Sequence, residues 1–339
     1  MNNKRCLALY SGGLDSILAI KLMEELGFEV LPIFFCTPYF GFSALLDPDS
    51  FRAKHAEKFG IKPDIIDYTK DITRILKDPA HGYGKHLNPC IDCKIGMLRQ
   101  TRTLLDKMDA SFVITGEVLG QRPMSQRSDT MRIIEKESGL EGLLLRPLCA
   151  IYMAETLPEK LGIVNKNELW GITGRGRKEQ VKRAISYGIK KEDIPNAAGG
   201  CLLADVRIAR KVRRTLDRHP RELPHKADLV MDVIGREFLL DPETVLAVGR
   251  DESENNIISK FVYPKNVFLR IEDVPGPLCV LRGRDTEENL SLAAGICLRY
   301  SRAKGMTGHR AIYGPDALHM VNSIEAPVFD EEYCATFQD

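Results

Sequence analysis

The sequence lacks long apolar segments and carries almost no net charge. None of its apolar runs is long enough to span a bilayer, and residues 1–5 lead into only five apolar residues, too few for a secretory signal. Its 48 Lys and Arg residues balance 47 Asp and Glu residues. The resulting net charge of +1 neither favours nor excludes binding to nucleic acid, because a basic face can be balanced elsewhere on the surface. We therefore expect a cytoplasmic protein without membrane contacts.

Internal repeats and low-complexity tracts are also absent, and the cysteines do not suit a disulfide framework. Nine cysteines are an odd number, and in a reducing compartment they indicate metal binding, catalysis or simple burial. Burial as inert thiols is expected for six of them: Cys6, Cys36, Cys149, Cys279, Cys297 and Cys334. A chain of 339 residues is long for a single core, which suggests two or three domains.

Expected strands and helices alternate over residues 5–150. The strands are 6–10, 29–35, 63–67 and 111–115, and the helices are about 15–27, 51–59, 71–77 and 94–108. Such alternation predicts an α/β fold, a doubly wound parallel sheet with helices on both faces. Ligands of these folds bind at the carboxyl ends of the strands.

The second half of the chain differs in composition. From about 151 to 203 it is polar and basic, a basic helix follows over roughly 203–217, and Pro220 and Pro224 flank the exit from that helix. Shorter strands and two helices, near 251–261 and 286–302, are expected beyond residue 225. This organisation predicts a catalytic domain over 1–203 with a basic, RNA-facing part from about 151, a basic helix and linker over 204–224, and a smaller α+β module over 225–339.

A glycine-rich loop, Ser11-Gly12-Gly13-Leu14-Asp15-Ser16, joins the first expected strand to the first expected helix. Glycines let the backbone approach an anion closely, and the free N–H groups of the new helix point toward it. The loop lacks the lysine and the spacing of a Walker A loop, and it does not match GxGxxG. It therefore predicts another kind of nucleotide-binding turn. The alternative is an ordinary helix cap, since Asp and Ser are common cap residues.

Three further cysteines form a second candidate site. Cys90 and Cys93 make a CxxC at the start of a helix, and Cys201 follows the glycines at 199–200. A redox dithiol would not need Cys201, and zinc would want a fourth ligand that no Cys or His pair near Cys201 supplies. Three thiolates can hold a [4Fe–4S] cluster with one open iron, and Lys94 with the helix N-terminus would help to keep them deprotonated. Zinc and structural thiols stay open as alternatives.

Polar residues follow the expected fourth strand, which lies beside the first strand in a doubly wound sheet. Gln121, Arg122 and Gln126 are candidates for contact with an activated base or with phosphates. Arg suits phosphate because its planar fork donates two hydrogen bonds at once. The alternative is a capped polar loop without a ligand.

The glycine-rich loop resembles the PP-loop of the ATP pyrophosphatases, which cleave ATP into AMP and pyrophosphate. The resemblance implies a fold like that of the adenine nucleotide alpha hydrolases, ATP as substrate, and Mg²⁺ held with the help of Asp15. It implies a pyrophosphate site at Ser11, Gly12, Gly13 and Ser16. In this class a glycine at the place of Gly116 lets the nucleotide come close, with Gln121 beside it, and backbone at Phe35 contacts adenine.

The segment Asn88-Pro89-Cys90-Ile91-Asp92-Cys93 resembles the NPCxxCN motif of the tRNA 2-thiouridylases, with Lys94 in place of the final Asn. Cys201 stands where that family has its later cysteine. In such enzymes ATP adenylates a base carbonyl, and sulfur then displaces AMP. Some members carry sulfur as a persulfide, for which Cys90 or Cys93 would react with Cys201, and others use a cluster held by three cysteines. Three matched cysteines favour the cluster.

Two basic segments are candidates for contact with RNA. One contains Arg175, Arg177 and Lys178, and the other places Arg207, Arg210, Lys211 and Arg214 at helical spacing. A charge run is usually a solvated face, but seven basic residues in the fifteen from 207 to 221 exceed what solubility requires. Phosphate contacts would make binding salt-dependent. The segment 248–256 resembles the RNA-binding module of NFACT proteins, and a structural or dimerising module is the alternative.

Together these features predict an ATP-dependent tRNA sulfurtransferase that adenylates a uridine carbonyl and replaces its oxygen with sulfur. Its partners would be tRNA and a sulfur donor, with a homodimer as one option. The first alternative is an amide-forming ligase of the same fold acting on a small molecule, which would need neither the three cysteines nor the basic helix. The second is a non-catalytic RNA-binding protein, which would bind tRNA without ATP–pyrophosphate exchange.

Overall fold

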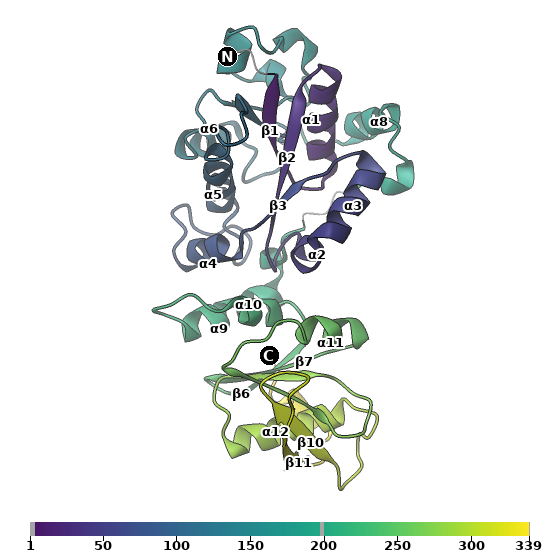
Figure 1. The fold of residues 1–339 in the computed structure, drawn as a ribbon. Helices are drawn as coiled ribbons and strands as arrows, with labels where there is room; N and C mark the ends of the chain where they lie inside the picture. The colour runs from purple at the N-terminus through teal and green to yellow at the C-terminus, as the bar shows by residue number, and fades with distance from the viewer. Residues whose placement is uncertain (1–3, 197–199, 339) are drawn as a thin grey trace. The chain divides into compact units, whose positions relative to one another are not determined.

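The computed structural model describes residues 4–196 and 200–338, and the chain divides into two compact units, Met1–Asp205 and Val206–Asp339 (Figure 1). Gly199, which precedes the third candidate cysteine in the sequence motif, lies outside the described residues. Throughout the described part of the chain, no helix has both the length and the apolar character that crossing a membrane requires.

The first unit is built on a five-stranded parallel sheet with the strand order β3-β2-β1-β4-β5. Its strands are β1 (Arg5–Tyr10), β2 (Glu29–Cys36), β3 (Asp64–Asp67), β4 (Phe112–Thr115) and β5 (Leu144–Leu145). β1 and β4 are almost wholly buried, as expected for central strands of a sheet that is covered on both faces. The predicted α/β fold is confirmed, and the carboxyl ends of β1 and β4 lie side by side at the switch point, where these folds bind ligands.

Helices cover both faces of this sheet. They are α1 (Leu14–Glu25), α2 (Phe42–Leu46), α3 (Pro48–Phe59), α4 (Thr69–Lys77), α5 (Cys90–Arg102), α6 (Ser128–Glu137), α7 (Leu157–Lys160) and α8 (Lys178–Ser186). Figure 1 shows α1, α3 and α8 on one side of the sheet and α4, α5 and α6 on the other. Ile17 and Leu18 of α1 share the main core with Phe112 and Ile114 of β4, so the helix that begins at the glycine-rich loop is anchored on the central strands.

Three helix starts differ from the sequence-based prediction by three residues or more. The helix expected from about 51 begins at Pro48, with Asp47 at its N-cap. The helix expected from residue 94 begins at Cys90, with Pro89 at its N-cap, where the N–H that proline lacks would have no helical partner. Cys90 and Cys93 therefore both lie in its first turn. The basic helix expected from 203 begins at Val206, because residues 202–204 form a separate 3-10 turn.

The second unit contains a six-stranded antiparallel sheet with the order β11-β10-β8-β9-β7-β6. Its strands are β6 (Arg236–Asp241), β7 (Thr244–Val248), β8 (Asn266–Ile271), β9 (Cys279–Arg282), β10 (Arg310–Gly314) and β11 (Asn322–Glu325). Its helices are α9 (Val206–Arg218), α10 (Lys226–Met231), α11 (Glu252–Ile258), α12 (Glu287–Arg299) and α13 (Glu331–Ala335). The predicted smaller α+β domain is confirmed.

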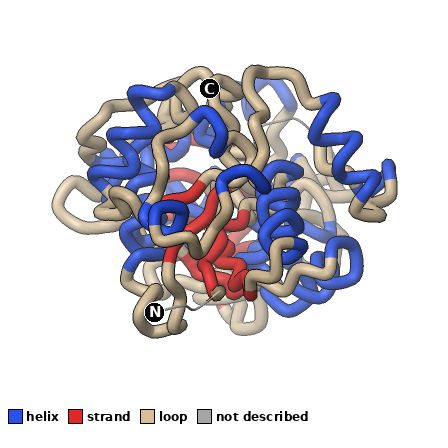
Figure 2. Tube along the Cα trace, turned by 90° about the horizontal axis from the view of Figure 1, so that it is seen from above, coloured by secondary structure: helices blue, strands red, loops and turns tan. Residues whose placement is uncertain are grey.

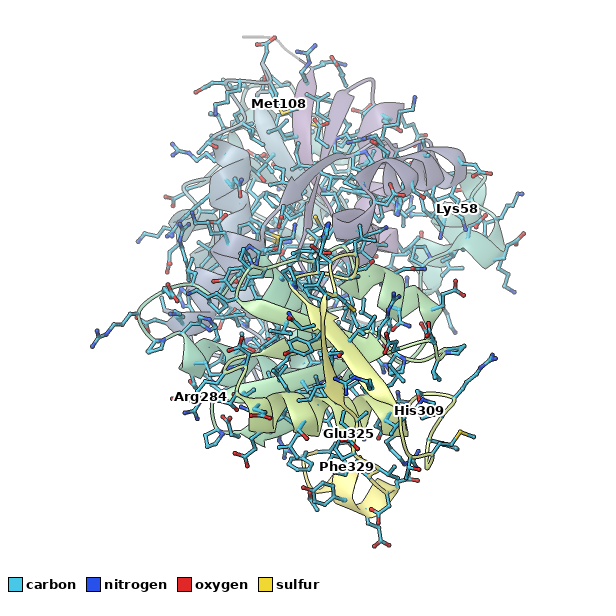
Figure 3. All side chains as sticks on the ribbon, turned by 60° about the horizontal axis from the view of Figure 1, so that its bottom comes forward. Lys58, Met108, Arg284, His309, Glu325 and Phe329 are labelled. Carbon is cyan, nitrogen blue, oxygen red and sulfur yellow. The ribbon has the colours of Figure 1, made fainter. Side chains whose placement is uncertain are left out.

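The core of this second unit lies between α12 and the sheet. Leu290 and Ile296 of α12 pack with Phe238 and Leu246 of the strands. Figure 2, seen from the end at which the first unit lies in Figure 1, shows the strands of that unit (red) with helices (blue) on either side. Arg284, in the turn that follows β9, projects outward (Figure 3) and pairs with Asp241 at 3.5 Å and Glu243 at 3.2 Å.

Candidate nucleotide and thiol site

The glycine-rich loop forms a tight turn between β1 and α1. Gly12 has φ +72°, a conformation that favours glycine, and Gly13 is the N-cap of α1. Ser16 Oγ donates to the carbonyl of Gly13 at 2.8 Å, and the N–H of Ser11 donates to Ser16 Oγ at 3.3 Å. The loop thus holds serine hydroxyls and the start of a twelve-residue helix around one turn, an arrangement suited to a phosphate group.

Gly116, directly after β4, packs on the backbone at the start of α1. A Cβ at this position would lie 2.4 Å from the carbonyl carbon and oxygen of Asp15 and from the N of Ser16. Glycine is therefore required so that the end of β4 can approach the first helical turn. The close approach that the structure shows is to protein backbone, and the predicted approach of a nucleotide at Gly116 stays a prediction.

The Asp15 carboxylate is hydrogen-bonded to the first of two linked amide side chains. Gln121 Nε2 donates to Asp15 Oδ2 at 2.9 Å, and Gln180 Nε2 donates to Gln121 Oε1 at 3.5 Å. Burial raises the pKa of Asp15, and the Gln121 hydrogen bond with the charges of Arg177 and Arg122 opposes that shift. Asp15 Oδ1 is buried and has no hydrogen-bond partner among the described residues. An oxygen of this kind fits a hard cation such as Mg²⁺.

The three candidate cysteines are brought together by long-range backbone hydrogen bonds. Leu202 N–H donates to the carbonyl of Tyr39 at 2.9 Å, and Leu87 N–H donates to the carbonyl of Leu203 at 3.2 Å. These bonds hold residues 201–203 against the loop after β2 and the loop before α5. Cys201 consequently lies near the first turn of α5, close enough to interact electrostatically with both Cys90 and Cys93.

All three thiols are held in the neutral form by their surroundings. Burial raises the pKa of Cys90 and Cys93, and it raises that of Cys201 to about 11. Lys94 opposes the shift at Cys90 and Cys93 but does not overcome it. Lys94 thus acts in the predicted direction on both thiols of α5, and the expectation that a bound cluster would hold deprotonated thiols stays a prediction.

The thiols do not form a metal-binding arrangement in this structure. Among residues 4–196 and 200–338, no group of three or more His, Cys, Asp or Glu side chains is positioned to hold a metal ion. Cys90, Cys93 and Cys201 thus fit an iron–sulfur cluster by number and chemistry but not by their present arrangement. The predicted cluster stays a prediction.

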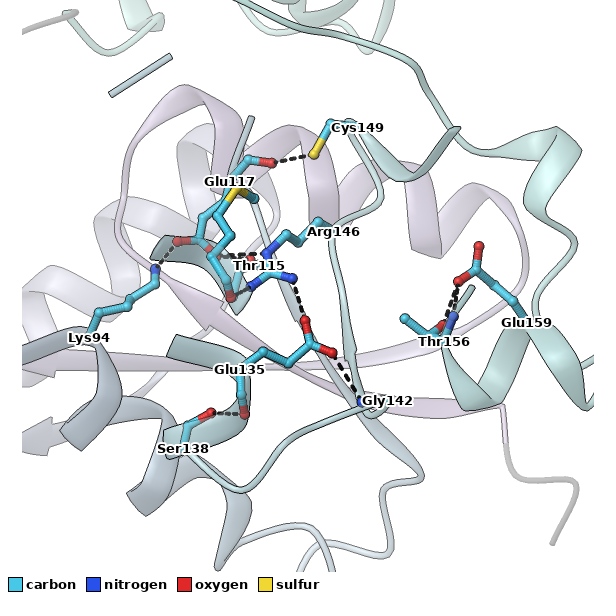
Figure 4. Close-up of polar contacts among 11 residues, drawn as sticks. Lys94, Thr115, Glu117, Glu135, Ser138, Gly142, Arg146, Cys149, Thr156 and Glu159 are labelled. Carbon is cyan, nitrogen blue, oxygen red and sulfur yellow. Dashed lines mark hydrogen bonds and ion pairs between the residues drawn. The ribbon is translucent and has the colours of Figure 1, made fainter. Parts of the chain in front are cut away.

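A buried ion-pair network joins the thiol-bearing helix to the loop after β4 (Figure 4). Lys94 Nζ lies 3.5 Å from Glu117 Oε1, and Arg146 Nε lies 3.2 Å from Glu117 Oε2. Arg146 also pairs with Glu135 at 2.8 Å, and Thr115 Oγ1 donates to Glu117 at 2.9 Å. Sequence reasoning assigned no role to Glu117, although its place directly after Gly116 at a strand end was an available signal. The network fixes the loop that carries Gln121.

His55 supports the glycine-rich loop from the side of α3, a role that sequence reasoning did not assign. Its ring lies 3.3 Å from the position of a Cβ on Gly12 and is 2.5 Å from the hydroxyl of Tyr10. Burial lowers the pKa of His55 to about 4, so the ring is neutral at physiological pH.

Phe35, whose backbone was predicted to contact adenine, is buried. Its ring packs edge-on against that of Tyr68, with 5.3 Å between the ring centroids. Its contact with a nucleotide stays a prediction.

The candidate RNA-binding residues fall in different environments. Arg175 and Lys178 are exposed, while Arg177 lies at the N-cap of α8 and acts on the Asp15 carboxylate. In the second unit, Arg207 and Arg210 of α9 are exposed. Lys211 and Arg214, on the same side of that helix, are only partly exposed: Arg214 pairs with Glu237 at 3.0 Å, and burial lowers the pKa of Lys211. Exposure alone does not show contact with RNA, so the predicted RNA contacts of these residues stay predictions.

Comparison with known families matches two separate segments of the chain. Residues 2–157 match the family described as "Thiamine biosynthesis protein (ThiI)", and residues 235–337 match the "NFACT protein RNA binding domain". A probable tRNA sulfurtransferase of Thermococcus kodakarensis is 27% identical over 164 residues, which are 47% of this chain and 41% of that protein. This chain therefore spans less than half the length of that relative.

Two solved structures show weaker likeness. A 4-thiouridine synthetase in complex with RNA and bound ATP is 18% identical, with a TM-score of 0.39, over 64% of this chain and 51% of the other. The U34-tRNA thiolase NcsA from Methanococcus maripaludis with its [4Fe-4S] cluster is 16% identical, with a TM-score of 0.32, over 68% and 70%.

The family matches coincide with the segments in which the sequence motifs occur. The segment 2–157 contains the glycine-rich loop, the CxxC and the loop after β4, and the segment 235–337 contains most of the second unit. The predicted resemblances are confirmed: the front of the chain is similar to the PP-loop tRNA sulfurtransferases, and its C-terminal part is similar to the NFACT RNA-binding domain.

Proposed function

We propose that this protein is an ATP-dependent sulfurtransferase that thiolates a uridine of tRNA. The observation that carries the proposal is that the loop after β4 contacts both candidate sites: Gln121 Nε2 donates to Asp15 at 2.9 Å, and Glu117 lies 3.5 Å from Lys94, which directly follows Cys93. The charge of Arg122 in the same loop also opposes the rise that burial causes in the pKa of Asp15 and of Cys90. These contacts support a single reaction site for the nucleotide loop and the thiols, as a reaction that couples ATP cleavage to sulfur transfer requires.

The proposed chemistry begins with activation of the base. A uridine carbonyl oxygen attacks the α-phosphorus of ATP, and pyrophosphate leaves. The turn at Ser11–Ser16 stabilises the charge that develops on this leaving group, since its N–H groups and the helix N-terminus are already oriented. Hydrosulfide from the sulfur donor then attacks the activated carbon and loses its proton. AMP leaves with the former carbonyl oxygen, which breaks the carbon–oxygen bond and leaves a carbon–sulfur double bond.

Asp15 would hold Mg²⁺ in this site. Its buried and unpartnered Oδ1 supports that role, and Gln121 keeps the other carboxylate oxygen in place. The ion would supply charge neutralisation at the polyphosphate.

Cys90, Cys93 and Cys201 would handle the sulfur. We further propose that they bind a [4Fe–4S] cluster, which would supply an open iron for a sulfur ligand. Their number and mutual proximity support this, but their present arrangement is not that of a ligand set, so no step of the mechanism runs through the cluster. Iron and acid-labile sulfide measured after anaerobic purification would test it. Absence of both, with a persulfide trapped on a cysteine, would replace the cluster with persulfide chemistry.

The second unit would contribute to tRNA binding. The match of residues 235–337 to the NFACT RNA binding domain supports this role, and so do the exposed Arg207 and Arg210 of α9. We expect tRNA binding to weaken as salt is raised.

The decisive experiment compares the thionucleosides of bulk tRNA in a deletion strain and its parent by mass spectrometry. One thiolated nucleoside should disappear in the deletion strain and return with the wild-type gene but not with Cys201→Ala. Cys6→Ala is the matched control, because Cys6 lies at the opposite end of β1 from the glycine-rich loop. Unchanged thionucleosides, in a strain without a second enzyme of this kind, would reject the proposal and favour a small-molecule adenylating ligase.

A further inference from the structure

Two aromatic side chains are stacked at the surface of the second unit. The rings of His225 and Tyr263 lie nearly parallel, with an interplanar angle of 8° and 4.3 Å between their centroids. His225 is exposed, and Tyr263 is half-buried. Because one face of the imidazole ring lies on Tyr263, the exposed surface of His225 consists of the opposite face and the edges of the ring. The pair therefore presents a flat aromatic surface to solvent.

Backbone and side-chain hydrogen bonds hold both rings in place. His225 is the N-cap residue of α10, and its Nδ1 accepts a hydrogen bond from the N–H of Ala227 at 3.2 Å. Tyr263 lies just before β8, and its carbonyl accepts from the N–H of Asn266 at 2.9 Å. The buried side chain of Asn266 donates to Asp228 of α10 at 3.4 Å. These bonds join α10 to the start of β8, so the stack is formed before any ligand binds and little conformational entropy is lost on binding.

Two lysines flank Tyr263 in the segment 259–265, which joins α11 to β8. Lys260 and Lys265 are exposed, and neither forms an ion pair with another of the residues that the structure describes. Val262, between them, is 43% exposed. The segment therefore places unpaired positive charge and apolar surface next to the stacked rings.

A flat aromatic face beside unpaired cations matches the chemistry of single-stranded nucleic acid. Every nucleobase has a π face, and unpaired bases are commonly bound by stacking on aromatic rings, including those of Tyr and His. Lysines attract the phosphates that link such bases. Within a double helix the bases already stack on one another, so paired RNA could use the lysines but not the rings. An acidic protein surface would likewise use only the lysines.

We propose that His225 and Tyr263 form a stacking platform for an unpaired nucleotide of tRNA, with Lys260 and Lys265 on its phosphates. The base would continue the stack on the open face of His225. This inference rests on the proposed function and deepens it, because it gives the second unit a particular element of tRNA to bind, a loop or a single-stranded end. His225 lies outside residues 235–337, which match the RNA-binding family, and only the fold brings it to Tyr263.

The test removes the ring of His225 and keeps its role as a helix cap. In His225→Asn the side-chain oxygen can still accept from the N–H of Ala227, so Tm should be unchanged. Filter binding measures the affinity of the full chain for tRNA and for an RNA duplex without unpaired bases. His225→Asn should weaken tRNA binding by about 5- to 100-fold and duplex binding by less than about twofold. His225→Tyr, which restores an aromatic face, should recover most of the loss.

The dependence of affinity on salt separates stacking from charge. His225→Asn should leave the slope of log affinity against log salt unchanged, because stacking releases no counterions. Replacing both Lys260 and Lys265 by Ala should lower that slope by about 1 to 2. The matched control is Tyr333→Ala, which removes another exposed aromatic ring of the same unit. Tyr333 directly follows two glutamates, which repel phosphate, so this change should leave tRNA affinity unchanged.

The outcomes separate this inference from the proposed function. Unchanged tRNA affinity in a folded His225→Asn protein overturns the inference, leaves the sulfurtransferase proposal intact and favours an acidic protein as the partner of the lysines. Equal losses of affinity for tRNA and for the duplex also overturn it, because they would reflect a structural role of the ring. If tRNA binding depends on His225 as predicted but the deletion strain keeps all its thionucleosides, the inference stands and the proposed sulfurtransferase fails. A wild-type chain that binds no tRNA overturns both.

Discussion

The two units use their charged residues in different ways. In the first unit, Asp15 and Gln180 leave buried oxygens without hydrogen-bond partners at the carboxyl edge of the sheet. In the second unit, a buried arginine belongs to the interior: Arg282 pairs with Asp232 at 3.0 Å and with Glu237 at 2.8 Å, although Arg282 Nε and Asp232 Oδ2 also have no hydrogen-bond partner among the described residues. The difference is one of place. The unpartnered atoms of the first unit belong to residues linked through Gln121 at the glycine-rich loop, whereas those of the second unit belong to ion pairs that join elements of the fold.

The basic helices illustrate the same difference at the level of single residues. Arg177 at the start of α8 faces a carboxylate that is only partly satisfied, and Arg214 of α9 pairs with the buried Glu237. Both arginines belong to charge runs of similar composition. Their roles differ because their acidic partners come from distant parts of the chain.

The largest expected effect is on the stability of the second unit. Arg282→Leu should destabilise it by about 3–5 kcal/mol, because Asp232 and Glu237 would remain buried without their shared cation. Urea unfolding measures this loss. A change below about 1 kcal/mol would mean that the ion pairs do not hold the unit together, and the contrast with the first unit would fail.

The next effect is on activity without loss of stability. Asp15→Asn keeps the shape of the side chain but removes the charge that would hold Mg²⁺, so ATP–pyrophosphate exchange should fall by about 100-fold. Stability should stay the same or rise slightly, because burial disfavours the ionised carboxylate. If the variant has a normal Tm and exchanges ATP and pyrophosphate at the wild-type rate, Asp15 is not part of the nucleotide site.

A smaller effect concerns the pH dependence of stability in the first unit. Burial lowers the pKa of His55 from its ordinary 6.5 to about 4, so between these values the unfolded chain binds a proton that the folded chain does not. Stability should therefore be intact above pH 6.5 and fall by about 1–2 kcal/mol as pH decreases toward 4, since the ring is partly solvated. His55→Phe should lose this dependence. Unfolding curves collected from pH 4 to 7 provide the measurement, and parallel curves for both proteins would contradict it.

The smallest effect should separate the exposed arginines of α9 from the partly buried Arg214. Replacing the exposed Arg207 and Arg210 by Ala should weaken tRNA binding several-fold and lower the slope of log affinity against log salt by about 2. The matched control, Arg214→Ala, should instead reduce stability and leave the salt slope unchanged, because Arg214 pairs with Glu237. Equal effects of both changes on tRNA binding would show that pairing with Glu237 does not keep Arg214 from RNA.

Local sequence predicted much of the fold and part of the site. The alternation of apolar runs with helical segments predicted the parallel sheet, and the SGGLDS turn predicted the start of α1 within one residue. Such features depend on neighbours along the chain, because glycine conformations and helix starts are set within a few residues. The burial of the thiols could not be predicted in this way. Charges next to Cys90 are visible in the sequence, but the burial that raises its pKa comes from distant segments.

The sequence by itself determined the chemistry that is present: a phosphate-binding turn, three cysteines and two basic segments. Only the tertiary structure decided which of these groups meet. Two backbone hydrogen bonds, at Leu202 and Leu87, bring Cys201 to the helix that begins at Cys90. The bridge between Leu119 and Thr173 brings Arg177 to Asp15. These contacts join residues more than fifty positions apart, and they form because the whole sheet and its helices must bury their apolar faces together.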